Sequence, residues 1–454
     1  MKHYLTLAGA LLSGILLLAA CGPTGTTSDG TTVDSGVAIK PPSASGLTTT
    51  VRRALTLGTG DNSVLLDIFG VVSATATVNV VSGPAGLTAT VGTLSNPSSA
   101  ETLVKLNIVP GSARAGDLVT FGVTLNGKTA TVQVPVMAFT TEAISAAGLS
   151  SRYQAGTMRT QPDGTLLLSS SLSGSVTERH SLVKYDPATH TFSVIAFPIT
   201  LPGEAITSQT TMPDGTIWVS VRGLSAEGSY LIVRRPDSTF KTYLVGAPND
   251  TVNNLTTTSD GRIWFTQNKA ASVKALTPAT GSVEAFAVTE KADSLVRGTD
   301  GKLYYAAFYA RPAIVQLDPA SGQSKSFNVG DAGVSLPLAL TAASDGSIWF
   351  TESRTGSVWH LNPSTGTQTP FTLPSGVRPT ELTFDSAQNL WVSDATNALL
   401  YTAFSTDGSK GKETNVTGFG AVTNNGTPAG PSALTTGPDG KIWYVAAGQL
   451  VHQQ

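Results

Sequence analysis

The chain lacks several features on which common functions depend. It has one cysteine among 454 residues, so no disulfide can form within it. Only 13% of its residues are charged, its net charge is −2, and it has no run of Lys or Arg. Neither nucleic acid nor an anionic bilayer surface is therefore an expected partner. It also contains no G-x-S-x-G elbow, no H-E-x-x-H and no phosphate loop.

The chain is instead dominated by one repeated phrase, which occurs seven times between residues 163 and 443. Each copy has a tight turn, usually Asp-Gly, then an aliphatic residue and a large residue that we call the register residue. The register residues are Leu167, Trp218, Trp264, Tyr304, Trp349, Trp391 and Trp443, at successive intervals of 51, 46, 40, 45, 42 and 52. A period of about 40–50 residues built from short strands predicts β-propeller blades and not a helical solenoid.

Each repeat alternates like four short strands. Residues 255–288 contain L-T-T-T, I-W-F-T-Q, S-V-K-A-L-T-P and S-V-E-A-F-A-V. Asp-Gly supplies the positive backbone angle of a hairpin turn between the first two strands. A second turn, such as T-P-A-T-G, closes the third strand against the fourth. We therefore predict an all-β fold with a seven-bladed propeller over residues 137–454.

The last copy is short of an outer strand, because only residues 449–454 follow its second strand. The segment 135–144, P-V-M-A-F-T-T-E-A-I, is similar to outer strands elsewhere in the chain. We predict that it completes the last blade and so removes the open sheet edges that invite aggregation. The alternative is an apolar linker between domains.

The first 20 residues are predicted to be a lipoprotein signal peptide. Lys2 precedes an apolar run from Leu5 to Leu18, and small residues follow, which fits a signal peptide and not a membrane-spanning helix. The sequence L-A-A-C-G resembles a bacterial lipobox, which implies lipid attachment at Cys21 and a location in the cell envelope outside the cytoplasm. A buried leftover cysteine is the alternative. Residues 21–50, rich in Thr, Ser, Gly and Pro, are expected to form a flexible tether.

Residues 51–136 alternate without the repeated phrase. They contain five or more strand-like runs, such as T-L-V-K-L-N-I-V (102–109), separated by turns such as Asn126-Gly127. This pattern predicts a small β-sandwich ahead of the propeller. It resembles the immunoglobulin-like modules of bacterial surface proteins, which usually space or present another domain.

The repeat S-D-G-S-I-W-F-T-E-S-R-T-G-S-V-W-H-L-N-P-S-T-G (344–366) resembles that of the virginiamycin B lyase family, the streptogramin lyase-like propellers. The resemblance covers about residues 140–454 and implies a ligand site on the channel face, where the loops after the second strands meet. It also implies a catalytic His just before an innermost strand and Glu residues that bind Mg²⁺, opening a depsipeptide ring by elimination.

The catalytic His is missing at the position that the resemblance indicates. Eleven residues before the register residues, the chain has Gly156, Thr207, Asn253, Asp293, Leu338, Thr380 and Ser432. His180, which follows Glu178-Arg179 after the second strand of the first blade, is the one remaining candidate base, since an ordinary imidazole pKa suits that role. A solvated loop histidine is the alternative.

Carboxylates fit the resemblance better. Three residues after the register residues lie Ser170, Val221, Gln267, Ala307, Glu352, Asp394 and Ala446. We predict that Glu352, Glu381 and Asp394 converge near the channel mouth, where their oxygens could bind Mg²⁺ or Ca²⁺. The alternative is that they pair with Arg354 or Arg378. Other ligand contacts are predicted at Asn253, Asn254, Gln267 and Arg378.

Three functions are compatible with these features. The first is a lipid-anchored binding propeller whose channel face recognises a small molecule, glycan or protein. The second is a metal-dependent lyase, or a lactonase-like enzyme, that uses residues outside the family motif. The third is a structural envelope component without a ligand. We favour binding, because it accounts for the sandwich, the tether and the missing His together.

Overall fold

The computed structural model describes residues 46–454 except for 59, 61, 151–152, 172–173, 202, 223–227, 248–249, 268–271, 288–291, 308–310, 331–334, 374–375, 395–398, 406–416, 420–422, 425–426 and 429. The predicted signal peptide, Cys21 and nearly all of the predicted tether lie outside these residues. Two short helices are present in the described part, η1 (Ile144–Ala147) and α1 (Val176–Arg179). No helix in that part is long and apolar enough to cross a membrane.

Residues 47–138 form strands around one apolar core. The strands are β1 (Thr48–Leu57), β2 (Ser63–Phe69), β3 (Thr77–Ser82), β4 (Thr88–Ser98), β5 (Glu101–Val109), β6 (Leu118–Leu125) and β7 (Lys128–Ala143). One group pairs in the order β1-β2-β5-β4 and a second in the order β3-β6-β7, and a short parallel pairing of β1 with β7 joins the two groups. Leu66, Leu106 and Phe121 are fully buried between them. Alternating apolar residues on paired strands thus bury one face of each group.

Five separate four-stranded antiparallel sheets follow and form blades of a β-propeller. Their strands are β8 (Ala155–Thr160), β9 (Leu166–Ser170), β10 (Ser181–Asp186) and β11 (Thr191–Ala196); β12 (Ala205–Thr211), β13 (Ile217–Arg222), β14 (Tyr230–Arg234) and β15 (Phe240–Leu244); β16 (Val252–Thr257), β17 (Ile263–Gln267), β18 (Ser272–Thr277) and β19 (Ser282–Ala287); β20 (Ala292–Arg297), β21 (Leu303–Ala307), β22 (Ala313–Leu317) and β23 (Ser324–Asn328); β24 (Pro337–Ala342), β25 (Ile348–Glu352), β26 (Ser357–Leu361) and β27 (Gln368–Thr372). The predicted all-β propeller is therefore confirmed.

The remaining strands pair in two further sets. One set is β28 (Pro379–Phe384), β29 (Asn389–Asp394), β30 (Leu399–Ser405) and β31 (Thr417–Phe419), and a short pair β32 (Thr423–Asn424) and β33 (Thr427–Pro428) stands apart. The other set is β34 (Ser432–Thr436), β35 (Ile442–Ala446), β36 (Gln449–Gln453) and β7. In that set Gln453 pairs with Phe139 and Gln449 with Ala143, antiparallel. The predicted pairing of segment 135–144 with the last strand is confirmed.

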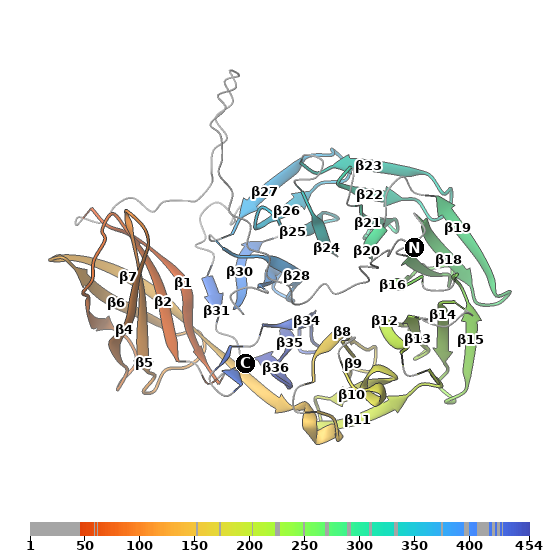
Figure 1. The fold of residues 1–454 in the computed structure, drawn as a ribbon, viewed down its shortest axis with the longest axis horizontal. Helices are drawn as coiled ribbons and strands as arrows, with labels where there is room; N and C mark the ends of the chain where they lie inside the picture. The colour runs from red at the N-terminus through yellow and green to blue at the C-terminus, as the bar shows by residue number, and fades with distance from the viewer. Residues whose placement is uncertain are drawn as a thin grey trace, which may run out of the picture. The chain divides into compact units, whose positions relative to one another are not determined.

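The first strand of each set faces the centre of a ring (Figure 1). These inner strands are β8, β12, β16, β20, β24, β28 and β34; each contacts the next, and β34 contacts β8. The register residues lie on the strand that follows, and they pack toward the next set. Trp264, for example, is fully buried in one cluster with Leu295 and Tyr305. Burying an aromatic register residue at a junction between two sets contributes on the order of 2 kcal/mol or more to stability.

The Asp-Gly turns have a second determinant besides glycine. Gly261 has φ +80°, the left-handed conformation that the turn requires. The Asp side chain accepts a hydrogen bond from the backbone N–H two residues on, as Asp345 Oδ1 does from Ser347 at 2.8 Å. Both residues of the phrase are therefore fixed by the turn itself. In the degraded copy, Gln388 occupies the glycine position and still adopts φ +63°.

Candidate functional site

The inner strands share one irregularity, a β-bulge, which changes the direction of a side chain. In all of them the pairing with the second strand slips near the start, as between Asn253 and Leu255 in β16 and between Pro379 and Leu382 in β28. Such β-bulges bend a strand and turn a side chain away from the regular alternation. Asn254 and Glu381 lie at two of these bulges, and Asn254 has φ +45°. The sequence pattern did not predict the bulges.

Threonine is the commonest residue on the inner surface of the ring, which also carries two arginines and the carboxylate of Glu381. We define the inner surface as the half-buried and exposed side chains of the inner strands. Eight residues before the register residues stand Arg159, Thr210, Thr256, Val296, Thr341, Thr383 and Thr435, each paired with a register residue. Arg159 and, one position later on β20, Arg297 are exposed. Solvent therefore reaches the inner surface, although the inner strands enclose it.

Both arginines lie without a salt bridge or a side-chain hydrogen bond to any residue that the structure describes. A guanidinium group offers five N–H donors and remains charged, so it is suited to bind a carboxylate or phosphate. The repeat pattern did not indicate either residue as a site residue. The sequence did contain a signal for Arg159, because it is the one charged residue among the positions eight residues before the register residues, which are otherwise threonine and valine.

Glu381 couples neighbouring inner strands instead of standing free. Its Oε2 accepts a hydrogen bond from Leu434 N–H on β34 at 2.7 Å, in the way that Ser294 Oγ accepts one from Leu340 at 3.1 Å. Burial raises the pKa of the Glu381 carboxyl, while the N–H groups of Leu434 and Ala433 and the charge of Arg159 act in the opposite direction without cancelling it. Glu381 thus connects the inner strands β28 and β34 through a hydrogen bond.

Replacing Glu381 by Gln is expected to remove a pH-dependent loss of stability. The raised pKa means that the folded state holds this proton more tightly than the unfolded state. Below about pH 4.5, the pKa of this carboxyl in the unfolded state, Glu381 is protonated in both states and does not change the free energy of unfolding. As the pH rises through the higher pKa of the folded state, the Glu381 carboxyl lowers the free energy of unfolding. Urea unfolding of both proteins from pH 4 to pH 8 measures this. Parallel curves for wild type and Glu381→Gln would contradict the prediction.

Glu352 is fully buried and holds two loops together. Its carboxylate accepts hydrogen bonds from Leu336 N–H, in the chain that enters β24, and from Arg354 N–H at 3.3 Å. It also accepts bonds from Thr355, whose N–H lies at 2.7 Å and whose hydroxyl donates as well. The residue type that matches the family motif thus organises the backbone on the channel face.

Asp394 has the same position one set later and a similar role. It is fully buried, and its Oδ1 accepts a hydrogen bond from Arg378 N–H at 3.1 Å, the residue before β28. The structure thus links Arg378 to Asp394 through its backbone, while the Arg378 side chain is exposed. Across the described ranges, no group of three or more His, Cys, Asp or Glu residues is arranged to hold a metal ion. Metal binding by Glu352, Glu381 and Asp394 stays a prediction.

Gln267 lies at the same position in an earlier blade but has a different environment. Its side chain is fully buried, and neither Oε1 nor Nε2 has a hydrogen-bond partner in the described part of the chain. The Ser229 and Ser272 hydroxyls are buried and unpartnered there too. Gly246 packs so closely that a Cβ would lie 2.2 Å from Gln267 Nε2. Buried polar groups of this kind usually bond to a water molecule or a ligand.

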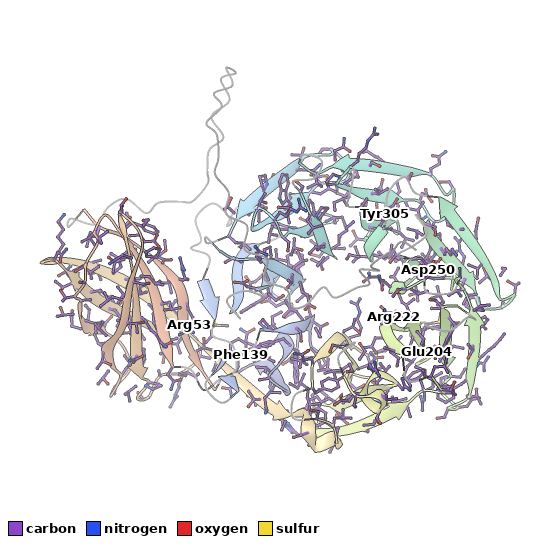
Figure 2. All side chains as sticks on the ribbon, viewed as in Figure 1. Arg53, Phe139, Glu204, Arg222, Asp250 and Tyr305 are labelled. Carbon is purple, nitrogen blue, oxygen red and sulfur yellow. The ribbon has the colours of Figure 1, made fainter. Side chains whose placement is uncertain are left out.

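His180 is held by the backbone of the next blade. It caps the C-terminus of α1, and its Nε2 lies 3.1 Å from the Glu204 carbonyl oxygen. With only 9% of its surface exposed, the alternative of a solvated loop histidine is wrong. The Glu204 carboxylate accepts a hydrogen bond from Tyr230 at 2.5 Å, and Arg222 lies close beside β12 in Figure 2. Sequence reasoning missed this Glu204–Tyr230 pair, which no repeat position marks.

The ring of inner strands and its polar surface define a β-propeller. The model of the virginiamycin B lyase family matches residues 192–409. A streptogramin B lyase structure is similar, with 17% identity over 70% of this chain and 97% of that one and a TM-score of 0.58. Virginiamycin B lyase from Staphylococcus aureus is similar at 16% identity over 70% of this chain and 98% of that chain, with a TM-score of 0.57.

A third solved structure, of YCF48 bound to D1 peptide, is similar at 11% identity over 66% of this chain and 94% of that chain, with a TM-score of 0.50. No curated protein matches the chain in sequence. The family model thus matches a part of the propeller, and the lyase structures share its fold. At these identities the structures establish the fold and no more.

Proposed function

We propose that this protein is a lipid-anchored envelope protein whose seven-bladed propeller binds a ligand on its inner surface and follows an immunoglobulin-like β-sandwich. Seven copies of the repeated phrase and a closed ring of inner strands support the blade count. Two groups of paired strands around one core support the sandwich. The resemblance of residues 18–22 to a lipobox supports the anchor.

The observation that carries the binding function is the inner surface itself. Arg159 and Arg297 are exposed and form no salt bridge with any described residue, although the charge of Arg159 also acts on Glu381. A ligand that bears hydroxyl groups and a carboxylate would supply partners for the arginines and for the threonine hydroxyls of this surface, and several blades could contact it at once. Acidic sugars and the carboxyl-bearing parts of glycans or peptides have this chemistry.

Glucuronate is expected to raise the melting temperature of the wild-type protein more than glucose does at the same concentration. A ligand that binds only the folded state must stabilise it. The Arg159→Ala variant should lose the difference between the two sugars, whereas Lys128→Ala, an exposed change on β7, should keep it. Equal shifts for both sugars in the wild type would contradict a carboxylate site on the inner surface.

A lyase of the virginiamycin B lyase type is the second candidate, favoured by the family match. No His stands at the motif positions, which the structure places on the inner strands. We therefore expect no ring opening of a streptogramin B antibiotic with Mg²⁺ or Ca²⁺ present. Mass spectrometry detects the linear product, and metal-dependent ring opening would favour the enzyme and point first to His180.

The anchor gives a prediction that is independent of the ligand. Replacing Cys21 by Ser removes the thiol that a lipid would modify, so the variant should leave the membrane fraction or remain unprocessed. Detergent partitioning of both proteins measures this. Unchanged partitioning of Cys21→Ser would contradict lipid attachment.

A further inference from the structure

A cleft of about 610 Å³ lies between the first two blades, at the ends of the strands where the Asp-Gly turns are found. Its walls include Leu167, Ile195 and Ile217, and its rim includes Asp163 and Asp214 of two such turns. It is therefore at the opposite end of the strands from the bulges and loops described above. Thr211, at the end of β12, is the one residue of the inner surface among its lining residues.

Aromatic pairs fill the corresponding space at other junctions. A register residue on the second strand of a blade packs against an aromatic residue on the fourth strand. The pairs are Trp218 with Tyr243 at 5.5 Å between ring centroids, Trp264 with Phe286 at 4.8 Å, and Trp349 with Phe371 at 5.3 Å. In each pair the register ring is buried and packs against the second ring between one blade and the next.

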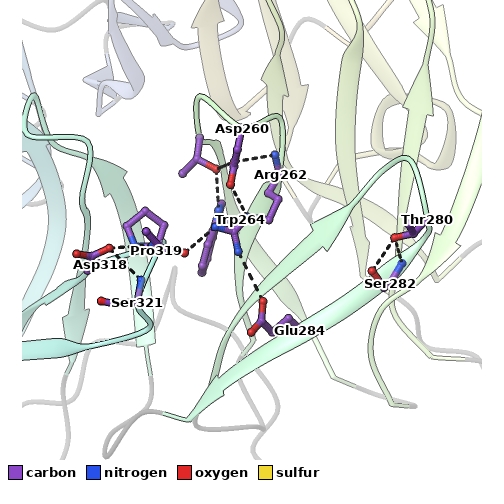
Figure 3. A network of polar contacts seen from close by, with 11 residues as sticks. Asp260, Arg262, Trp264, Thr280, Ser282, Glu284, Asp318, Pro319 and Ser321 are labelled. Carbon is purple, nitrogen blue, oxygen red and sulfur yellow. Dashed lines mark hydrogen bonds and ion pairs between the residues drawn. The ribbon is translucent and has the colours of Figure 1, made fainter.

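The junction after the third blade shows how completely such a space is closed (Figure 3). The Arg262 guanidinium lies 4.8 Å from the Trp264 ring and donates a hydrogen bond to Pro319 O of the next blade at 2.6 Å. It also bonds to Asp260 of its own turn at 2.6 Å and lies 3.6 Å from Glu284. Rings and charged groups together cover the junction there.

The first blade has aliphatic residues at both positions of the pair. Leu167 is the one register residue that is not aromatic. Ile195 on the fourth strand occupies the position that Tyr243 has in the second blade. Ile195 pairs with Leu182 on the third strand of its blade, as Tyr243 pairs with Leu231. Two rings present at other junctions are thus replaced by smaller side chains at the cleft. Leu167 and Ile217 form a buried floor, with 1% and 7% of their surfaces exposed, and the half-buried Ile195 offers more accessible apolar surface to the cleft.

The rim of the cleft carries both signs of charge. Lys184 Nζ forms an ion pair with Asp163 Oδ2 at 2.9 Å, and Arg234 and Asp214 lie on the second blade's side. Burial raises the pKa of Asp163, but hydrogen bonds from Thr165 and Lys184 outweigh it and lower the pKa to about 2. The opening is thus polar and neutral in net charge, and the walls combine the aliphatic residues with polar side chains such as Thr165 and Ser193.

We propose that this cleft binds an aromatic ring, which takes the place of the indole and phenyl groups that the other junctions supply from their own blades. Aliphatic side chains at the floor of a cleft give an aromatic ring apolar contact, and the polar side chains of the lining can fix its orientation. Because positive and negative charges at the rim balance, the entrance favours a ligand whose group beside the ring is neutral or zwitterionic. The ring is either that of a free aromatic compound or a Trp or Phe side chain of a peptide.

Indole is the probe that tests the site on the full-length protein. At about five times its Kd, indole should raise the melting temperature of the wild type by about 2 °C. The double variant Leu167→Trp with Ile195→Phe restores the aromatic pair and fills the cleft. It should melt higher than the wild type and show no response to indole. Val283→Phe, which adds a ring at a residue 36% exposed on another blade, should respond like the wild type.

The single variant Ile195→Phe provides a milder filling if the double variant does not fold, and it should weaken the indole response about tenfold or more. N-acetyl-tryptophanamide distinguishes the source of the ring: a response equal to that of indole indicates a peptide side chain, and a response to indole alone indicates a small molecule. No response of the wild type up to the solubility limit of indole, or an undiminished response in the filled variants, would overturn the proposal.

Discussion

A chain that begins at residue 146 is expected to be less stable than a chain that begins at residue 137 by at least about 5 kcal/mol. The longer chain keeps the part of β7 that pairs with β36 from Phe139 to Ala143, and the shorter one loses it. Phe139 is 2% exposed and packs edge to face against Tyr444 at 5.8 Å. Removing the strand therefore opens an aromatic contact and leaves β36 as an unpaired edge.

Denaturant unfolding of both chains measures this difference, and aggregation of the shorter chain is a second expected readout. Phe139→Ala in the full-length protein provides an independent measurement, with an expected loss of about 3–5 kcal/mol, because it removes the buried ring and keeps the backbone pairing. If the chain that begins at residue 146 unfolds at the same denaturant concentration as the longer one, β7 does not close the ring in solution.

Glu352→Ala is expected to lower the free energy of unfolding by about 3 kcal/mol. The substitution leaves the buried N–H groups of Leu336 and Thr355 without their acceptor and creates a cavity beneath two loops. Buried donors without partners cost more than the net value of the bonds that they lose. The same variant should also raise the hydrogen exchange of Leu336 and Thr355, because both loops lose their shared contact.

Two variants control for this result. Glu352→Gln keeps one acceptor oxygen and should lose about half as much stability. Glu284→Ala removes a carboxylate whose side chain is 64% exposed, and it should change stability by less than about 0.5 kcal/mol. If Glu352→Ala unfolds like Glu284→Ala, the carboxylate does not hold the loops. If it loses a metal response without losing stability, the predicted metal role is favoured.

The sequence by itself determined the propeller class and the strand that completes the last sheet. A turn phrase with a register residue depends on local backbone chemistry, such as the positive φ of Gly261, so its repetition is readable without a structure. The pairing of 135–144 followed from counting strands in the last copy. Both inferences rest on periodicity, which a linear sequence records directly.

The tertiary structure alone decided what the marked side chains do. Glu352 and Asp394 match the positions of family carboxylates, but their oxygens bond to the backbone N–H groups of Leu336 and Arg378, which lie 16 residues away in the chain. The cleft beside Leu167 likewise depends on the contact between two blades. Leu167 and Ile195 are smaller than the aromatic side chains of other blades, and only the packing of the second blade decides whether a cleft remains beside them. Position in a repeat fixes where a side chain lies, and its partners from other strands fix its role.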